Sequence, residues 1–362
     1  MTNDKMILLN PGPVNLSDRV RNALLRPDLC HREVEFSQLQ SRIREQLLQV
    51  YGLGSDRWAA VLLTGSGTAA MEAMISSLVP RNGKLLVIEN GVYGERLSKI
   101  AKIHGINYIT LSHPWNAEID INALVKLLDE NTDITHLAVV HHETTTGRLN
   151  NLLELAPICQ ERRIKLLVDG VSSFGAEELN FADWGITACA ATANKCLHGV
   201  PGVSFVILQR DALPVDTIPR TLYLDLGTYC QQQDRGGTPF TQSIQTFYAL
   251  TEALQEMTEA GGWRARHSHY NQLASLVRDG LTSMGIKPLL LLGTSVVLNA
   301  YYLPNGFSYE EFHDQLKAQN YIIYSGQGNL AQSIFRVSTM GAITQADMER
   351  FLVVVKQIIR NS

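Results

Sequence analysis

The sequence is poor in cysteine, and it lacks long apolar runs. Among 362 residues there are five cysteines, which form no CxxC pair and no metal-ligand spacing: Cys30, Cys159, Cys189, Cys196 and Cys230. This usage is typical of a reduced, intracellular protein, so we expect a cytoplasmic location and no metal site. No apolar run reaches transmembrane length, and the first residues lack the apolar core of a signal peptide. We therefore expect no membrane association.

Charge is also scarce. Charged residues make up 18% of the chain and the formal net charge is −4, which gives no electrostatic reason to expect nucleic acid or an anionic membrane as a partner. The low share of charge indicates that part of the surface is buried in an oligomer. Hydrophobic residues make up 45%, enough for a large core, and the length predicts one large domain or two ordinary ones.

Short apolar runs alternate with helical patterns through the first two thirds of the chain. The runs predict buried strands at residues 59–64, 84–88, 107–111, 135–142, 164–168, 186–191 and 203–208. Strands that alternate with helices predict an α/β fold around a mostly parallel sheet. A polar segment, residues 231–241, is predicted to be a long loop before a helix at 242–259.

The pattern changes after Gly261-Gly262. Helices near residues 263–284, 309–318 and 344–360 alternate with strands near 289–291, 296–303, 321–324 and 334–338, which predicts a smaller α+β domain. We therefore divide the chain into an N-terminal arm (residues 1–15), a large domain (16–260) and a small C-terminal domain (261–362). The arm must pack on the core or on a second subunit.

Two polar residues follow buried strands in the segment from 164 to 208. Asp169 ends one apolar run, and Lys195 comes shortly after another. Ligands bind at the carboxyl edge of open α/β sheets, and pyridoxal phosphate needs a lysine that forms an imine and an acidic partner for its ring nitrogen. The pair therefore indicates this cofactor. Taken singly, Asp169 is more typical of a turn or helix cap and Lys195 of a solvated surface.

A strand, a glycine-rich turn and a helix follow one another at residues 59–74. Ser66, Gly67 and Thr68 stand at the predicted helix start, where free N–H groups and the helix dipole attract anions. The turn lacks the lysine of a P-loop and the spacing of GxGxxG. It fits a phosphate, and it fits an ordinary capped helix equally well.

Three further segments supply candidate ligand contacts. Tyr93 follows a strand between two glycines, where its ring can stack on a planar ligand or cap the core. The hydroxyls of Thr144, Thr145 and Thr146 follow another strand. Arg336 stands inside an apolar strand, so its charge needs a partner, either a ligand carboxylate or phosphonate or a structural salt bridge.

In combination and in this order, several segments resemble one family: LLNPGPVN, TGSGTAAMEA, NGVYGER, HHETTTG, LLVDGVSSFG, ATANKCLHGVPG, TPFT and FRVSTMG. The chain resembles, over nearly its whole length, the fold-type I pyridoxal-phosphate transaminases of the alanine–glyoxylate, serine–pyruvate and 2-aminoethylphosphonate group. The ETTTG, ANKC-x-x-GVPG and PFT segments are most similar to the 2-aminoethylphosphonate–pyruvate branch. The CHREVEF segment is more similar to the broader alanine–glyoxylate group, which leaves the amino donor open.

The resemblance implies a role for each matching residue. Lys195 matches the lysine that binds the cofactor and Asp169 the partner of its ring nitrogen, whereas Tyr93 matches the stacking aromatic. Other matches are the phosphate loop and further cofactor contacts, namely Ser66, Gly67, Thr68, Thr145, Thr192 and, donated by a second subunit, Thr241. Arg336 matches the arginine that binds the substrate anion. The family works as a homodimer with shared active sites, and the expected reaction moves an amino group from 2-aminoethylphosphonate to pyruvate.

Three alternatives remain at this point. An alanine–glyoxylate or serine–pyruvate transaminase would use the same machinery. A pyridoxal-phosphate lyase would need no oxo acid. A nucleotide-binding α/β protein could use the GSGT turn for phosphate, but it leaves Asp169 and Lys195 unexplained.

Overall fold

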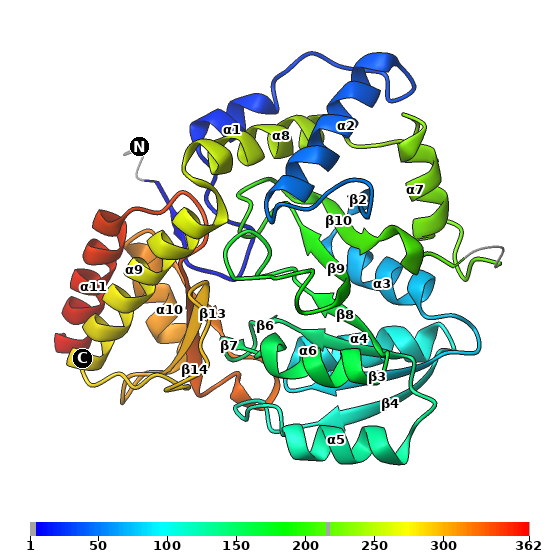
Figure 1. The fold of residues 1–362 in the computed structure, drawn as a ribbon. Helices are drawn as coiled ribbons and strands as arrows, with labels where there is room; N and C mark the ends of the chain where they lie inside the picture. The colour runs from blue at the N-terminus through cyan, green and yellow to red at the C-terminus, as the bar shows by residue number, and fades with distance from the viewer. Residues whose placement is uncertain (1–4, 215–217, 362) are drawn as a thin grey trace.

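The computed structural model describes residues 5–214 and 218–361 (Figure 1). Its helices are α1 (Asp18–Ala23), α2 (Val34–Gln49), α3 (Gly67–Leu78), α4 (Val92–Ile103), α5 (Ile121–Glu130), α6 (Leu152–Glu161), α7 (Leu226–Asp234), α8 (Ile244–Glu259), α9 (Gly262–Ser283), α10 (Tyr309–Ala318) and α11 (Gln345–Arg360). Its strands are β1 (Ile7–Leu8), β2 (Trp58–Gly65), β3 (Lys84–Glu89), β4 (Asn107–Ser112), β5 (His136–Val140), β6 (His142–Glu143), β7 (Arg148–Leu149), β8 (Lys165–Asp169), β9 (Ile186–Thr192), β10 (Gly202–Gln209), β11 (Leu298–Tyr302), β12 (Tyr321–Ile322), β13 (Tyr324–Ser325) and β14 (Ile334–Ser338).

A seven-stranded sheet forms the centre of the larger part, in the order β2-β10-β9-β8-β5-β3-β4. Strands β4, β3, β5, β8 and β9 pair in parallel, whereas β10 runs antiparallel to both of its neighbours. The mostly parallel sheet predicted from the apolar runs is confirmed. These runs are continuously apolar because helices cover both faces of the sheet, so consecutive side chains are buried on opposite sides.

Two hydrophobic clusters fill the space on the two faces. One face packs against α2, α5, α6 and α8, and its largest buried rings include Phe36, Phe205 and Phe247. The other face packs against α3, α4 and α7, with Met71, Met74 and Tyr229 in the cluster. Residues that follow one another along a strand alternate between the clusters: Val61 belongs to the second and Leu62 to the first.

The C-terminal part contains a three-stranded antiparallel sheet, in the order β11-β14-β13, with α9, α10 and α11 (Figure 1). This confirms the predicted smaller α+β part, while the boundaries at residues 15 and 260 stay predictions. The N-terminal arm packs on this part, because β1 pairs in parallel with β12, Ile7 opposite Tyr321. Ile7 and Leu9 are buried in the same cluster as Phe335 and Phe351.

Two local predictions were wrong. The predicted strand at residues 289–291 forms only an isolated bridge between Pro288 and Tyr301, and Leu291 is 80% exposed. Proline lacks the N–H that a ladder needs. The predicted loop at residues 231–241 begins inside α7, because the buried Gln233 side chain bonds both backbone groups of Leu62 and so fixes the helix against β2. None of the helices in the described residues is both long and apolar enough to cross a bilayer.

Candidate active site

The carboxyl edge of the large sheet gathers the polar residues that follow its strands. The strand register aligns Val140 with Asp169 and Asp169 with Ala190, and Thr192 with Ser204 on the next strand. Gly65 lies opposite Gly202, so the turn after β2 begins at the same edge. Parallel neighbours therefore bring together residues that are far apart in the sequence.

Asp169 ends β8 and is 3% exposed. Its Oδ1 accepts a hydrogen bond of 2.9 Å from the Val171 N–H. Burial raises the pKa of Asp169 to about 7; the Val171 N–H opposes this shift, and the negative charge of Glu143 adds to it. The positive charges of Arg96 and Lys195 lower the same pKa. Asp169 is thus a carboxyl group that ionises readily only beside a cation or a strong donor.

Lys195 follows β9 and lies beneath the N-terminal arm. Its ammonium donates a hydrogen bond to the carbonyl oxygen of Pro11. Gly12 is needed there, because a Cβ on it would lie 2.8 Å from Lys195 Cδ, and its φ is +116°. Burial lowers the pKa of the Lys195 amine to about 8, and the charges of Arg336 and Arg96 act in the same direction. A neutral amine, the nucleophilic form, is accessible near neutral pH.

Ser66, Gly67 and Thr68 form the start of α3, with Ser66 as the N-cap residue. The Ser66 side chain is exposed and makes no capping hydrogen bond within the described chain. Gly67 lies against the loop after Asp169, because a Cβ on it would be 2.9 Å from both methyl groups of Val171. Thr68 Oγ1 accepts a hydrogen bond of 3.3 Å from Arg96. A helix N-terminus, two hydroxyls and a guanidinium lie together here, and this combination of groups suits an anion.

Tyr93 lies in the first turn of α4, and the Arg96 guanidinium is 4.6 Å from the centre of its ring. Thr145 is fully buried in the loop between β6 and β7, and its Oγ1 accepts a 3.1 Å hydrogen bond from the Val92 N–H. Tyr93 and Thr145 are therefore neighbours across two segments. Glu143 joins them, since its carboxylate accepts hydrogen bonds from both.

Arg336 is 2% exposed in β14, on the small sheet. Its Nε donates to the Ser325 carbonyl at 2.9 Å and its Nη1 to the Thr144 carbonyl at 2.8 Å. No carboxylate of the described residues pairs with it, so the structural salt bridge considered from the sequence is absent from that part of the chain. Burial lowers the pKa of Arg336, while negative charge on Tyr93 and Glu143 raises it. A buried cation held only by carbonyl groups favours an anionic ligand.

The last two predicted residues differ in their surroundings. Thr192 ends β9, 3% exposed, and its Oγ1 lies 2.8 Å from Asn194 Oδ1 and 3.2 Å from the Val203 carbonyl. Thr241 is exposed, and the described chain brings it into no hydrogen bond with another predicted site residue. Its neighbour Gln242 does bond Thr64 at 2.9 Å, two residues before Ser66.

Sequence reasoning missed Glu143 and Arg96. Glu143 is fully buried at the end of β6, and burial raises its pKa. It directly follows an apolar strand, which is the signal that identified Asp169, and that signal could have found it. Arg96 lies three residues after Tyr93, which is the spacing of neighbours on a helix face.

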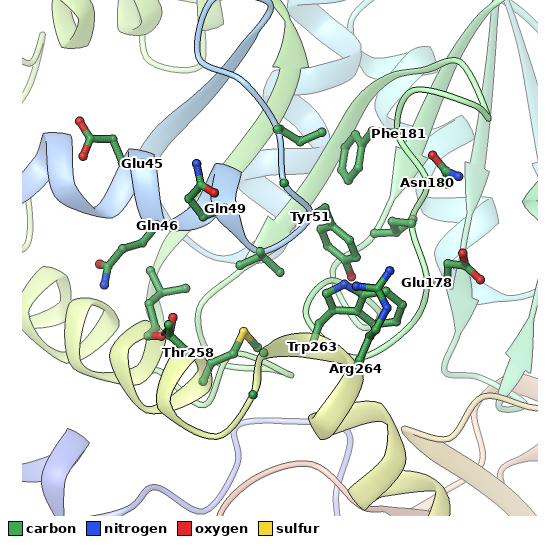
Figure 2. A pocket seen from close by; sticks show the side chains of 18 of the residues that line it. Glu45, Gln46, Gln49, Tyr51, Glu178, Asn180, Phe181, Thr258, Trp263 and Arg264 are labelled. Carbon is green, nitrogen blue, oxygen red and sulfur yellow. Dashed lines mark hydrogen bonds between the residues drawn. The ribbon is translucent and has the colours of Figure 1, made fainter.

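A cavity of about 1050 Å³ lies elsewhere, between α2, α8, the start of α9 and the loop after β8 (Figure 2). Tyr51 and Trp263 meet in it with ring centres 5.5 Å apart, and Arg264 lies over Trp263 at 4.7 Å. The Tyr51 hydroxyl bonds the backbone of Glu177 and Gly175, so this ring braces the loop. None of the predicted site residues is among the described residues that line this cavity, so its size alone does not locate the active site.

The chain belongs to the class-V aminotransferases, since the model of that family matches residues 18–351. Enzymes of this class depend on pyridoxal phosphate. The seven-stranded sheet and the α+β part likewise match solved structures of fold-type I aminotransferases. An alanine–glyoxylate aminotransferase from Nostoc sp. superposes with a TM-score of 0.92 at 26% identity, over 99% of this chain and 97% of that one.

Curated relatives are similar over nearly the whole chain. A 2-aminoethylphosphonate–pyruvate transaminase of Aeromonas hydrophila is 36% identical over 96% of this chain and 93% of its own length. A bifunctional phosphonoacetaldehyde hydrolase/aminoethylphosphonate transaminase of Clostridioides difficile is 34% identical over 98% of this chain. The chain spans 56% of that longer protein.

Proposed function

We propose that this class-V aminotransferase transfers the amino group of 2-aminoethylphosphonate to pyruvate, which yields phosphonoacetaldehyde and alanine. The observation that carries the proposal is the buried, carbonyl-held guanidinium of Arg336, whose positive charge acts on the amine of Lys195. The names of the relatives from Aeromonas hydrophila and Clostridioides difficile support the choice of donor.

The residues at the sheet edge fit pyridoxal phosphate. Asp169 offers a buried carboxylate oxygen for a protonated ring nitrogen, and that cation would favour the ionised form of the carboxyl group. The start of α3 offers N–H groups and the hydroxyls of Ser66 and Thr68 for the phosphate. When bound, the cofactor supplies an electron sink that stabilises negative charge at the carbon losing its proton.

Side chains of the protein would bind the cofactor and transfer the proton. Lys195 would hold the cofactor covalently, and as a free neutral amine it would accept the proton from the donor carbon and give it back as an acid. Its low pKa favours both roles, because a neutral amine is needed to accept that proton. The Tyr93 ring would offer an aromatic face to the cofactor, and Thr145 and Thr192 would offer hydroxyl groups to it.

Arg336 binds the anionic end of each substrate in turn. Its planar guanidinium can donate two parallel hydrogen bonds to a phosphonate in one half-reaction and to the carboxylate of pyruvate in the other. This use explains why a charged side chain stands in a buried strand without a carboxylate among the described residues.

We also propose a homodimer in which Thr241 of one subunit contacts the cofactor phosphate of the other. Its exposure fits this role. Mixing a Lys195→Ala variant with a Thr241→Glu variant tests it, after subunit exchange in mild denaturant. If Thr241 acts across the interface, the mixed dimer holds one intact site and regains activity. If it acts within its own chain, both sites of the mixed dimer are damaged and activity stays lost.

A second candidate is an alanine–glyoxylate or serine–pyruvate aminotransferase. The likeness of the fold to the Nostoc alanine–glyoxylate enzyme favours it. Arg336 would then bind carboxylates in both half-reactions, with the same Lys195 and Asp169.

The absorption spectrum of the purified protein distinguishes these reactions. With 2-aminoethylphosphonate and no pyruvate, the proposed enzyme converts its visible cofactor band to the amino form of the cofactor, and pyruvate restores the band. A band that ignores 2-aminoethylphosphonate but responds to alanine or serine identifies the second candidate. Absence of any band after reconstitution with pyridoxal phosphate would overturn the role of Lys195.

A further inference from the structure

Glu143 is a fully buried carboxylate between two parts of the site. Its Oε2 accepts hydrogen bonds of 3.2 Å from the backbone N–H groups of Tyr93 and Gly94, in the first turn of α4. Its Oε1 accepts bonds from Thr145, 3.1 Å from the backbone N–H and 2.6 Å from the hydroxyl. Both carboxylate oxygens are thus occupied, one by each segment.

The carboxylate takes the place of a helix cap. The N-cap residue of α4 is Gly91, which has no side chain to accept the free N–H groups of the first turn. A Cβ on Gly91 would lie 2.2 Å from Glu143 Cδ, so the glycine leaves the space that the carboxylate fills. A negative group at this position also interacts favourably with the helix dipole. The start of α4 is therefore set by a residue about fifty positions away in the sequence.

Residues 143–145 fix three site residues in place, namely Tyr93, Thr145 and Arg336. Glu143 fixes the backbone of Tyr93, and Thr145 is fixed through its own N–H and hydroxyl. Thr144 lies between Glu143 and Thr145 in the chain, and its carbonyl accepts the hydrogen bond from Arg336. A shift of the Glu143 side chain would therefore move the ring of Tyr93 relative to Thr145 and to the substrate-facing guanidinium.

We propose that Glu143 is a positioning residue, which holds the Tyr93 ring and the Thr145 hydroxyl at a fixed spacing around the cofactor. The inference rests on the proposed cofactor contacts of Tyr93 and Thr145. It assigns no chemical step to Glu143, whose oxygens are engaged by donors of the protein itself.

The test compares three variants by cofactor binding and by melting temperature. Glu143→Gln replaces one acceptor oxygen by a donor that faces N–H groups. Glu143→Asp keeps the charge but withdraws it by one methylene. The matched control is Glu177→Gln, since Glu177 is a 2% exposed carboxylate that accepts bonds from Ser295 and Val296 instead.

We expect all three variants to have a lower melting temperature than the wild type. Both Glu143 variants should release pyridoxal phosphate at least about tenfold faster and lose most of the visible circular dichroism of the bound cofactor, which reports its asymmetric contacts. Glu177→Gln should keep both values within about twofold. In a Tyr93→Ala background, Glu143→Asp should cost less than it does in the wild type, because only the placement of Thr145 is left to lose.

Two results would overturn the proposal. One is a Glu143→Asp variant that releases the cofactor at the wild-type rate and keeps the wild-type circular dichroism. The other is equal loss in Glu177→Gln, which would make the effect one of general stability. Neither readout uses an amino donor, so a failure of the proposed substrate leaves this test intact. A wild-type protein without a cofactor band would instead overturn the assignment of Lys195, and this inference with it.

Discussion

Arg336 Nη1 donates a hydrogen bond of 2.8 Å to the carbonyl oxygen of Thr144. This contact joins β14 of the small sheet to the loop between β6 and β7, at the edge of the large one. It orients a buried guanidinium without neutralising it. The position of this guanidinium therefore depends on how the two parts of the chain meet.

The first prediction concerns Arg336 itself. Arg336→Gln should lower kcat/KM for 2-aminoethylphosphonate about 100-fold to 1000-fold, because a charge-assisted, two-pronged contact is lost. Arg336→Lys should recover only part, since an ammonium lacks the planar fork. Cofactor absorbance should be unchanged. Arg278→Gln is the control, because Arg278 also bonds neutral groups of the small part, Thr294 and Asn299. Equal losses in both variants would contradict the role of Arg336.

The second prediction concerns the pH dependence of the protein without cofactor. Burial raises the pKa of Asp169 to about 7, above its unfolded value near 4. A raised acid pKa makes the ionised form costly in the folded state, so the contribution of Asp169 to stability falls as pH rises from about 4 to about 7. Asp169→Asn should melt above the wild type, by a margin that grows over this range and then stays level.

Melting curves of the two apoproteins between pH 5 and pH 8 check this. A margin that stays constant with pH would contradict the raised pKa. With cofactor bound, the order should reverse, because asparagine cannot pair as an anion with a protonated ring nitrogen.

The third prediction concerns the turn before α3. Gly67→Ala should weaken pyridoxal phosphate binding about tenfold, because the new Cβ would lie 2.9 Å from both methyl groups of Val171 and push the helix start outward. Val171→Ala removes those methyl groups, so the double variant should bind the cofactor almost as well as Val171→Ala alone. Titration of the apoproteins with cofactor measures this coupling. Additive losses would rule out the contact as the cause.

The fourth prediction concerns His267, which contacts Glu177 at 3.4 Å. The hydrogen bond to Glu177 raises the pKa of His267, and the charge of Glu178 acts in the same direction. The stabilisation is therefore full below the unfolded pKa near 6.5 and is lost as pH rises through the higher folded value. His267→Gln should lower the melting temperature more at pH 6 than at pH 8.5. An equal loss at both values would assign the effect to packing alone.

The sequence predicted the large sheet well because its strands are buried on both faces. Each strand therefore appears in the sequence as one continuous apolar run of about the length of the strand. It failed at residues 289–291, where the same apolar character belongs to an exposed loop with Leu291 and Leu292 in solvent. It also placed Gln231 to Asp234 in a loop. The buried contact of Gln233 with Leu62 stabilises a helix there, and that contact lies outside any local pattern.

In the candidate site, too, residues marked by a local pattern could be found, whereas contacts between distant segments could not. The sequence singled out Asp169 and Lys195 because each follows an apolar strand, and Arg336 because it interrupts one; their roles stay predictions. Glu143 also follows an apolar run, but its bond to the Tyr93 N–H joins residues that are distant in the sequence. The bond of Arg96 to Thr68 is likewise beyond any local pattern. These contacts can be identified only in the folded structure, where the edge of the sheet brings the segments together.

The pairing of β1 with β12 has a consequence for the order in which the protein is made. Ile7 leaves the ribosome early, but its partner Tyr321 is synthesised only after the whole large sheet. The segment that follows β1 carries Pro11 and Gly12, the cover of Lys195. The strand pairing that anchors this cover can thus form only after the C-terminal part has been translated.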